Sequence, residues 1–261
     1  MPWTNASRQR LKKLFLEGFT VMDVAEPLAS FDAEKPAEEV RAFMDDRCYD
    51  LVGIRRDGVV CGYARRDELG GKGPCGNYLH PFGPDDLVAD TDPLQKAIES
   101  LSINNQCFVT VLDRVGAIIS LSDLEKPPMR MYLFGMITIL EMLMTRMIAE
   151  CFPNGSWRGH LSGGRLEKAE ELQRERMRRS QRVDLLDCLQ ISDKGQLALN
   201  IPWYREQLGG VGIASRKAAL KGLKEIESLR NNLAHTQEII PDGWQRIAIF
   251  TKRLDLLLEE L

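Results

Sequence analysis

The feature of the sequence that most constrains its fold is an internal repeat in the first half of the chain. The first copy contains F-D-A-E-K-P-A-E-E-V-R-A-F-M, then Y-D-L-V-G-I-R, then V-V-C-G-Y-A-R-R-D-E-L, within residues 31–69. The second copy contains V-A-D-T-D-P-L-Q-K-A-I-E-S-L, then Q-C-F-V-T-V-L, then V-G-A-I-I-S-L-S-D-L, within residues 88–124. Each copy predicts a strand, a helix, a strand, a turn, a strand and the start of a second helix.

Local signals support this interpretation of both copies. We expect Pro36 and Pro93 in the first turn of their helices, where the N–H that proline lacks would have no partner within the helix. Asp57-Gly58 predicts a two-residue hairpin turn between the strands of the first copy.

From Pro127 onward the hydrophobic pattern is helical throughout. The predicted fold class is therefore α+β, with β-α-β-β-α repeats followed by an all-α bundle. The expected parts are a leading helix over residues 1–17, a repeat domain over 18–126 and a helical domain over 127–261. Within the helical domain we expect an apolar helix over 131–152, a charged helix over about 166–182, an amphipathic helix over 183–199, a longer helix with Ser215 as its N-cap, and a last helix from Trp244.

Composition favours a soluble cytoplasmic protein. The chain is 44% hydrophobic and 28% charged, as is usual for globular domains. The six cysteines show no metal-ligand spacing and are expected to be reduced and mostly buried. Glu141 and Arg146 interrupt the most apolar stretch, so we expect a buried helix there and no membrane span, and the N-terminus lacks the pattern of a secretory signal.

The most specific part of the repeat is Ala117-Ile118-Ile119-Ser120-Leu121-Ser122-Asp123-Leu124. This stretch resembles the third strand of CBS domains, which carries a small residue, two aliphatic residues, Ser or Thr, two variable residues and Asp. The resemblance to a tandem CBS pair implies a cleft between the copies that binds an adenosine-containing ligand. By this resemblance Ser120 and Asp123 would line the cleft, and the Asp123 carboxylate would accept hydrogen bonds from a ribose.

The first copy departs from this pattern. Glu68 stands at the acidic position and Arg65 at the position of the Ser or Thr, while Asp67 offers a second register. Arg65 and Arg66 could bind a phosphate through paired N–H donors. The alternative for Ser120 and Asp123 is that they only cap the helix beginning near Leu124. Nothing in these residues selects one adenine nucleotide as the regulatory ligand.

A second motif, Leu229-Arg230-Asn231-Asn232-Leu233-Ala234-His235-Thr236, lies near the end of the longer helix. It resembles the ribonuclease signature of HEPN domains, an arginine followed by a polar residue and then a histidine four to six residues beyond the arginine. The resemblance implies a metal-independent endoribonuclease that leaves a 2′,3′-cyclic phosphate. His235 would transfer the proton of the ribose hydroxyl, Arg230 would bind the phosphate, and Asn231 would orient the histidine or the RNA substrate.

Helix geometry adds a constraint on this motif. His235 lies five positions after Arg230, which places them roughly 140° apart on a regular helix. One protomer alone would not complete the site, so we expect a homodimer, the arrangement that the resemblance also implies. The alternative is a histidine that interacts with the helix C-terminus, with Arg230 in a surface ion pair.

Together these motifs predict a nucleotide-regulated ribonuclease with RNA as its substrate. A basic run on the charged helix could follow an RNA backbone, although interleaved glutamates favour a solvated helix. The alternatives are a non-catalytic adenine-nucleotide sensor with a helical dimerisation or partner-docking domain, and the toxin of a HEPN toxin–antitoxin pair. The residues of the basic run are Arg174, Arg176, Arg178, Arg179 and Arg182.

Overall fold

The computed structural model describes residues 10, 13–14, 18–235, 239 and 245–259. The chain divides into two compact units, one of which is Leu16–Arg130 and the other of which contains Met131–Leu261. The division lies four residues beyond the predicted boundary at 126/127. The expected leading helix over 1–17 lies largely outside the described residues.

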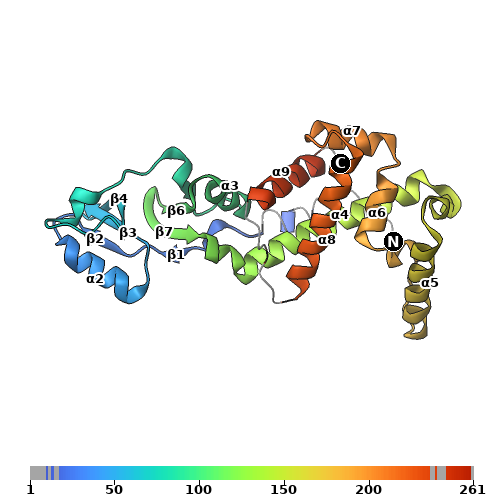
Figure 1. Ribbon diagram of the computed structural model, residues 1–261, viewed down its shortest axis with the longest axis horizontal. Helices are drawn as coiled ribbons and strands as arrows, with labels where there is room; N and C mark the ends of the chain where they lie inside the picture. Colours follow the sequence, from blue (N-terminus) through green and yellow to red (C-terminus); the bar gives the residue numbers. More distant parts are fainter. Residues whose placement is uncertain (1–9, 11–12, 15–17, 236–238, 240–244, 260–261) are drawn as a thin grey trace. The chain divides into compact units, whose positions relative to one another are not determined.

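The first repeat forms a three-stranded sheet, β2-β3-β4, and helix α2 connects β2 to β3 along the chain (Figure 1). Strand β2 (Ser30–Asp32) pairs in parallel with β3 (Leu51–Arg56), which pairs antiparallel with β4 (Val59–Arg65). Helix α2 (Ala37–Arg47) buries Ala37, Val40 and Met44, a spacing that places one apolar stripe toward the sheet.

The second repeat has the same topology. Strand β5 (Leu87–Ala89) pairs in parallel with β6 (Gln106–Val111), which pairs antiparallel with β7 (Arg114–Ser120), and α3 (Leu94–Asn104) connects β5 to β6. A short strand from before the first repeat, β1 (Glu26–Pro27), adds to β7. The order of the second sheet is therefore β1-β7-β6-β5, and the predicted repeat is confirmed.

The hairpin turns of the two repeats have similar backbone angles but different residue types. Asp57 and Gly58 have φ angles of 50° and 77°, which confirms the predicted two-residue turn. In the second repeat Leu112 and Asp113 take φ angles of 49° and 60° at the matching place. A leucine rarely adopts this left-handed conformation, so that turn has no sequence signal. Pro36 and Pro93 are the N-caps of their helices, one residue earlier than predicted.

The two sheets share an apolar core. Tyr63 on β4 packs its ring 5.0 Å from that of Phe108 on β6, and Phe82 packs 4.8 Å from Phe108. Leu28 and Val115 complete the buried cluster. Because side chains from both repeats fill this core, neither repeat would bury its apolar face alone.

Beyond residue 130 the described chain contains helices and no strands, so the predicted α+β class is confirmed. Helix α8 begins after Ser215, whose hydroxyl accepts a hydrogen bond from the Ala218 amide, as the sequence predicts. The α-helices are α4 (Pro127–Cys151), α5 (Gly163–Arg178), α6 (Ile191–Ala198), α7 (Pro202–Gly210), α8 (Arg216–Ala234) and α9 (Gln245–Glu259), and the short 3-10 helices are η6 (Pro153–His160) and η7 (Leu185–Cys188).

Several of the expected helix boundaries are wrong. The charged helix runs over 163–178 because Ser162 is its N-cap and Ser180 has a φ of 59°, so Arg182 lies beyond its end. The segment 183–199 contains the 3-10 helix η7 and the short α6 in place of one helix. Helix α7 was not predicted; Pro202 begins it at the first helical position, where proline is favoured.

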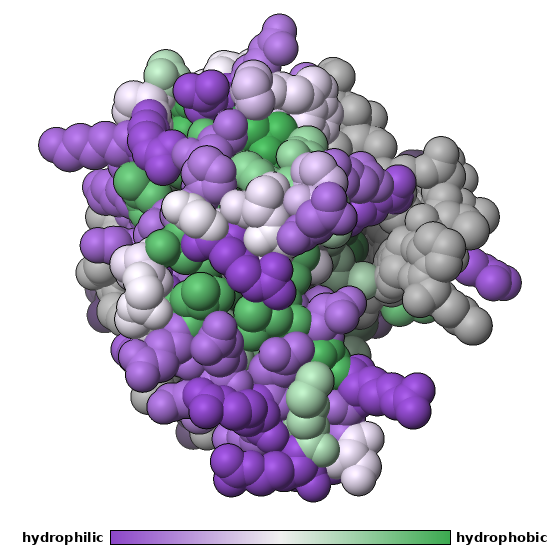
Figure 2. Space-filling model, turned by 90° about the vertical axis from the view of Figure 1, so that its right-hand side faces the viewer, coloured by the Kyte–Doolittle hydropathy of each residue, from purple (hydrophilic) through white to green (hydrophobic). Residues whose placement is uncertain are grey.

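Figure 2 looks onto the helical unit from the side on which α5 lies, and hydrophilic side chains cover most of that face.

Helix α4 is long and apolar enough to cross a membrane by length and composition alone. More than half of its most apolar stretch (56%) is buried inside the protein, and core helices of soluble proteins pass the same test. Met131 and Phe134 remain exposed on it. Much of the apolar surface of α4 is thus covered within the protein, and the homodimer stays a prediction.

The cysteines are all free. Cys75, Cys107 and Cys188 are buried, but the other three are exposed, so the expectation that most are buried is wrong. The exposed ones are Cys48, Cys61 and Cys151.

Candidate functional site

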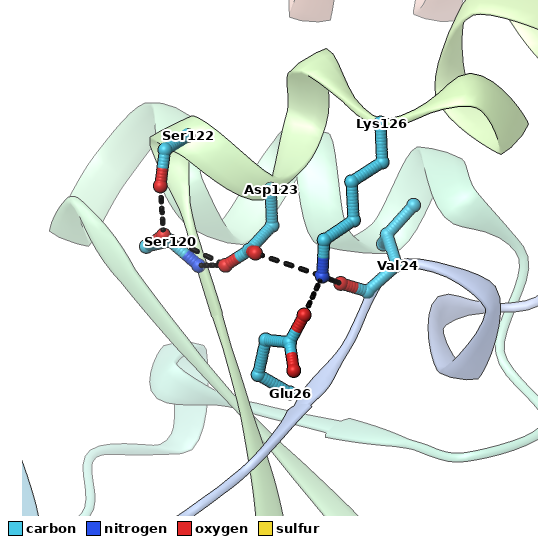
Figure 3. Close-up of polar contacts among 6 residues, drawn as sticks. All are labelled: Val24, Glu26, Ser120, Ser122, Asp123 and Lys126. Carbon is cyan, nitrogen blue, oxygen red and sulfur yellow. Dashed lines mark hydrogen bonds and ion pairs between the residues drawn. The ribbon is translucent and has the colours of Figure 1, made fainter.

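The predicted nucleotide-contacting pair Ser120 and Asp123 lies where β7 ends and the 3-10 helix η5 (Leu121–Glu125) begins (Figure 3). One oxygen of Asp123, Oδ2, accepts hydrogen bonds from the Ser120 amide at 2.8 Å and from the Ser120 hydroxyl at 2.7 Å. The capping arrangement weighed as the alternative is therefore present. It uses one carboxylate oxygen and leaves the other, Oδ1, turned away from Ser120.

Lys126 meets that second oxygen of Asp123. Its Nζ lies 2.9 Å from Asp123 Oδ1, donates to the Val24 carbonyl at 2.7 Å, and pairs closely with Glu26 on β1 (Figure 3). Burial lowers the pKa of Lys126, but hydrogen bonds to Glu26 and Asp123 outweigh that effect and raise the pKa above its usual 10.5. A positive charge is therefore held beside Asp123 at neutral pH.

The first repeat places Arg65 at the position of Ser120. Arg65 ends β4 opposite Leu51, just as Ser120 ends β7 opposite Gln106, so the strand registers support the alignment made from sequence. The guanidinium of Arg65 lies 5.6 Å from the centre of the Tyr63 ring and donates a hydrogen bond of 2.9 Å to the Gln106 side chain. Arg65 of one repeat thus reaches the strand that pairs with Ser120 in the other.

Gln106 is the residue of this site that the sequence did not indicate. It is 6% exposed, and its amide nitrogen donates a hydrogen bond of 2.8 Å to the Tyr63 hydroxyl. Its oxygen accepts from Arg65. The only signal available was its position at the start of a strand that is otherwise apolar.

The other predicted residues of the first copy lie beside Arg65 but make separate contacts. Arg66 forms an ion pair with Asp50 at 2.6 Å, and Glu68 pairs closely with His80, whose ring stacks on Tyr63. Asp67 is exposed. Neither acidic residue makes the capping contact that Asp123 makes with Ser120 in the second copy.

In the helical unit, Arg230 and Asn231 lie in the last turns of α8, and His235 directly follows the helix. The Arg230 side chain is 43% exposed, and its Nη2 lies 3.9 Å from Glu141 on α4. His235 is the C-cap residue; it is exposed and its backbone N–H donates to the Asn231 carbonyl at 3.1 Å. All three residues are thus accessible to a polyanion, although Arg230 already contacts a carboxylate.

Glu141 on α4 contacts side chains of both α6 and α8. Its second oxygen accepts a hydrogen bond of 2.8 Å from Lys194 on α6, a side chain that is 4% exposed. The glycine after Lys194 lets α6 approach α8 closely, because a Cβ at Gly195 would overlap the Leu223 side chain. The position of Arg230 therefore depends on how α4, α6 and α8 pack.

No protein-family model matches the sequence, and no curated protein matches it. The solved structures that match include CBS domains, and these matches cover just under half of the chain. The CBS domain of a bacterial CNNM/CorC family Mg²⁺ transporter, in complex with ATP, is 16% identical, with a TM-score of 0.37, and the match covers 46% of this chain and 94% of that one. CBSX2 in complex with AMP is 15% identical, with a TM-score of 0.37 and coverage of 41% and 93%. A conserved CBS domain protein from Thermoplasma acidophilum is 15% identical, with a TM-score of 0.36 and coverage of 45% and 75%.

TM-scores below 0.5 do not establish a common fold on their own. The topology of residues 16–130 therefore rests on its own strand order and registers. None of these matched structures is described as a ribonuclease or as a HEPN domain.

Proposed function

We propose that residues 16–130 are a tandem CBS pair that binds an adenine nucleotide and acts as a regulatory sensor. The observation that carries the proposal is the pairing of strand ends: Ser120 and Asp123 at the end of β7, and Arg65 at the matching end of β4, joined through Gln106. A carboxylate and a guanidinium at one edge offer acceptors for a ribose and donors for a phosphate.

The contacts that exist without a ligand leave capacity for one. An ionised carboxylate has about four acceptor positions, and Asp123 accepts two hydrogen bonds from Ser120 and one contact from Lys126. A guanidinium has five N–H donors, whereas Arg65 uses one on Gln106. Asp123 is 12% exposed, and the proposed ribose hydroxyl would bind to this exposed part of the carboxylate.

The capping role of Asp123 must be separated from its proposed ligand role. Asp23 makes the same kind of contact with the Thr20 amide, at 2.7 Å, before the first repeat. It is exposed and does not lie at either strand end. Asp23→Asn is therefore a matched control that removes a capping carboxylate without touching the proposed site.

The test is isothermal titration of the purified protein with ATP, AMP, adenosine and GTP. We expect the wild type and Asp23→Asn to bind an adenine nucleotide equally, and Asp123→Asn to bind about tenfold or more weakly, as the loss of a charged hydrogen bond of about 1.5–3 kcal/mol predicts. Arg65→Gln should weaken ATP more than adenosine, because only ATP carries phosphates. No binding of any adenine compound to the wild type at millimolar concentration would refute the proposal.

We propose a second function for the helical unit, that of a HEPN-type endoribonuclease using Arg230, Asn231 and His235, with RNA as substrate. The observation that favours it is that all three polar residues are accessible at one helix end, with Arg230 lying 3.9 Å from Glu141. The nucleotide-sensor proposal rests on more contacts. If the ribonuclease proposal fails, the helical unit becomes a dimerisation or partner-docking domain for the sensor. Incubating the protein with mixed RNA in EDTA and identifying the product ends tests it, since 2′,3′-cyclic phosphate ends indicate the proposed chemistry.

A further inference from the structure

The helical unit contains a cavity of about 620 Å³ that neither proposed site uses. It lies among α7, α8 and α9, and its walls include Leu208, Leu223, Ile226, Leu229, Phe250 and Leu254. A volume of this size falls within the range of about 300–1,000 Å³ that is typical of small-molecule sites. Most of the lining residues are apolar, so the space favours a hydrophobic body.

One buried polar group lies in this apolar wall. Tyr204 on α7 lines the cavity and is 4% exposed. Among the residues that the structure describes, its hydroxyl has no hydrogen-bond partner. Burial raises the pKa of Tyr204 to about 12, so the hydroxyl is protonated at neutral pH and can donate. A buried donor without an acceptor is costly, which points to an acceptor supplied from outside the described chain.

The charged residues of the lining are mostly cationic. Lys221 and Lys224 are exposed and line the cavity together with Arg253 and with Glu225, whose carboxylate lies 3.9 Å from Lys221. Among the described residues that line the cavity, three carry a positive charge and one carries a negative charge, which favours an anionic group there. The same cavity therefore presents a mostly apolar lining, a buried donor and an excess of positive charge.

We propose that this cavity binds a small amphipathic carboxylic acid, with its hydrocarbon body inside, its carboxylate near the cationic side chains and an oxygen acceptor on the body facing Tyr204. The positive charge selects a carboxylate over an amine, and the Tyr204 hydroxyl selects a chain that carries an oxygen over a plain hydrocarbon chain. The site lies in a different unit from Ser120 and Asp123, so this proposal does not depend on whether the protein binds a nucleotide.

The first experiment measures displacement of the fluorescent probe 1-anilinonaphthalene-8-sulfonate from the full-length protein. Decanoate should displace the probe and decylamine should displace it at least about tenfold less well. In a series of monoketo decanoates, at least one isomer should bind more tightly than decanoate. Tyr204→Phe should abolish that advantage while leaving decanoate binding unchanged.

Two variants fill the cavity from α8. A Cβ at Gly222 meets no atom within 4 Å, and Gly222 lines the cavity, so Gly222→Leu should occupy the space without a clash. Ala219→Leu is a second filling variant, from a buried position in the same wall. Gly164→Leu on α5 is the control, because it is also a helical glycine with open space but lies outside the cavity.

We expect each folded filling variant to lose at least about tenfold in decanoate affinity and Gly164→Leu to lose none. Failure of the wild type to bind both the probe and decanoate overturns the proposal, as does equal binding by a filled variant with an unchanged far-ultraviolet circular dichroism spectrum. A probe signal that falls as the protein doubles its mass at high concentration also overturns it, since a second copy would then occupy the cavity.

Discussion

The Arg65 guanidinium of the first repeat donates a 2.9 Å hydrogen bond to Gln106 of the second, and this contact joins the two strand ends that carry the proposed nucleotide site. Gln106 in turn donates to Tyr63, so that one buried amide satisfies groups from both repeats. A buried polar network of this kind favours one arrangement of the core, because the loss of any partner leaves another buried group unpaired.

Gln106→Leu should therefore destabilise the protein. The change leaves the hydroxyl of Tyr63, a residue that is 7% exposed, without its donor, and it removes the acceptor of Arg65. We expect a loss of about 1–3 kcal/mol in the free energy of unfolding, measured by urea denaturation. Tyr63→Phe in the Gln106→Leu background should recover part of that loss, because it removes the unpaired hydroxyl. Additive losses in the double variant would argue against the network.

Gly62 and Gly116 provide a test of how closely the first repeat packs. A Cβ at Gly62 on β4 would overlap the backbone oxygen of His80, which cannot rotate away, whereas a Cβ at Gly116 on β7 meets nothing within 4 Å. Gly62→Ala should cost about 1–3 kcal/mol of unfolding free energy through forced backbone movement, and Gly116→Ala should be close to neutral. Equal effects in thermal unfolding would contradict the close approach of β4 and His80.

The repeat could be predicted because its period and turn residues are local, whereas several contacts that complete the structure have no local signal. Asp57-Gly58 is a recognisable turn, but Leu112 occupies the same left-handed position in the second repeat with nothing in its residue type to indicate it. Strand β1 has two residues, and its pairing with β7 depends on tertiary contacts alone. Helix α7 was not predicted at all, although Pro202 stands at its first helical position, where proline is favoured.

The site was partly predictable for a similar reason. Ser120 and Asp123 belong to a spaced motif, and the strand registers support the alignment of Arg65 with Ser120. Gln106 belongs to no motif, and its role follows only from the approach of two strand ends that are distant in sequence. The capping contact of Asp123 was weighed from sequence, but its ion pair with Lys126 depends on the turn geometry of η5.

The Glu141–Lys194 pair predicts a large effect of a conservative change in the helical unit. Lys194 is 4% exposed, so Glu141→Gln leaves a buried cation without a counter-charge. We expect a loss of about 3–5 kcal/mol in unfolding free energy. Glu141→Leu combined with Lys194→Met should be much closer to the wild type, since it removes both charges. A small loss for Glu141→Gln in urea denaturation would show that Lys194 reaches solvent.

The six thiols should separate into two classes of reactivity. Burial raises the pKa of Cys107 to about 11 and also raises the pKa values of Cys75 and Cys188, so these thiols are protonated and covered at pH 8. Iodoacetamide labelling followed by mass spectrometry should find the exposed thiols modified first. Fast labelling of Cys107 in the folded protein would contradict its burial. The exposed thiols are Cys48, Cys61 and Cys151.

Cys107 also predicts a pH dependence of stability. Its folded-state pKa lies above the usual value of 9.0, so the unfolded chain releases this proton first as pH rises. The stabilisation is fully present below pH 9 and is lost as pH approaches 11. Cys107→Val lacks this titration, so its unfolding free energy should fall less steeply between pH 9 and pH 11 than that of the wild type. Parallel pH profiles in urea denaturation would show that the thiol does not titrate abnormally.

His235 and Arg230 are predicted to carry RNA cleavage while contributing little to the fold. His235 is an exposed C-cap residue and Arg230 is 43% exposed, whereas the buried face of α8 is formed by Ala219, Leu223 and Leu229. His235→Ala should therefore fold normally, with a loss of at most about 0.5–1 kcal/mol from the helix terminus.

Cleavage of RNA in EDTA by His235→Ala should fall at least about a hundredfold, the usual effect of removing a general acid or base. Arg230→Lys keeps the charge near Glu141 but loses the paired donors, so its rate should also fall substantially. Lys217→Gln on the same helix is the control, because it removes an exposed charge at the opposite end of α8 and should cleave like the wild type. If His235→Ala cuts RNA as fast as the wild type, the ribonuclease proposal fails, and the activity belongs to other residues or to a contaminant. The sensor proposal would remain, because it depends on Asp123 and Arg65 in the other unit.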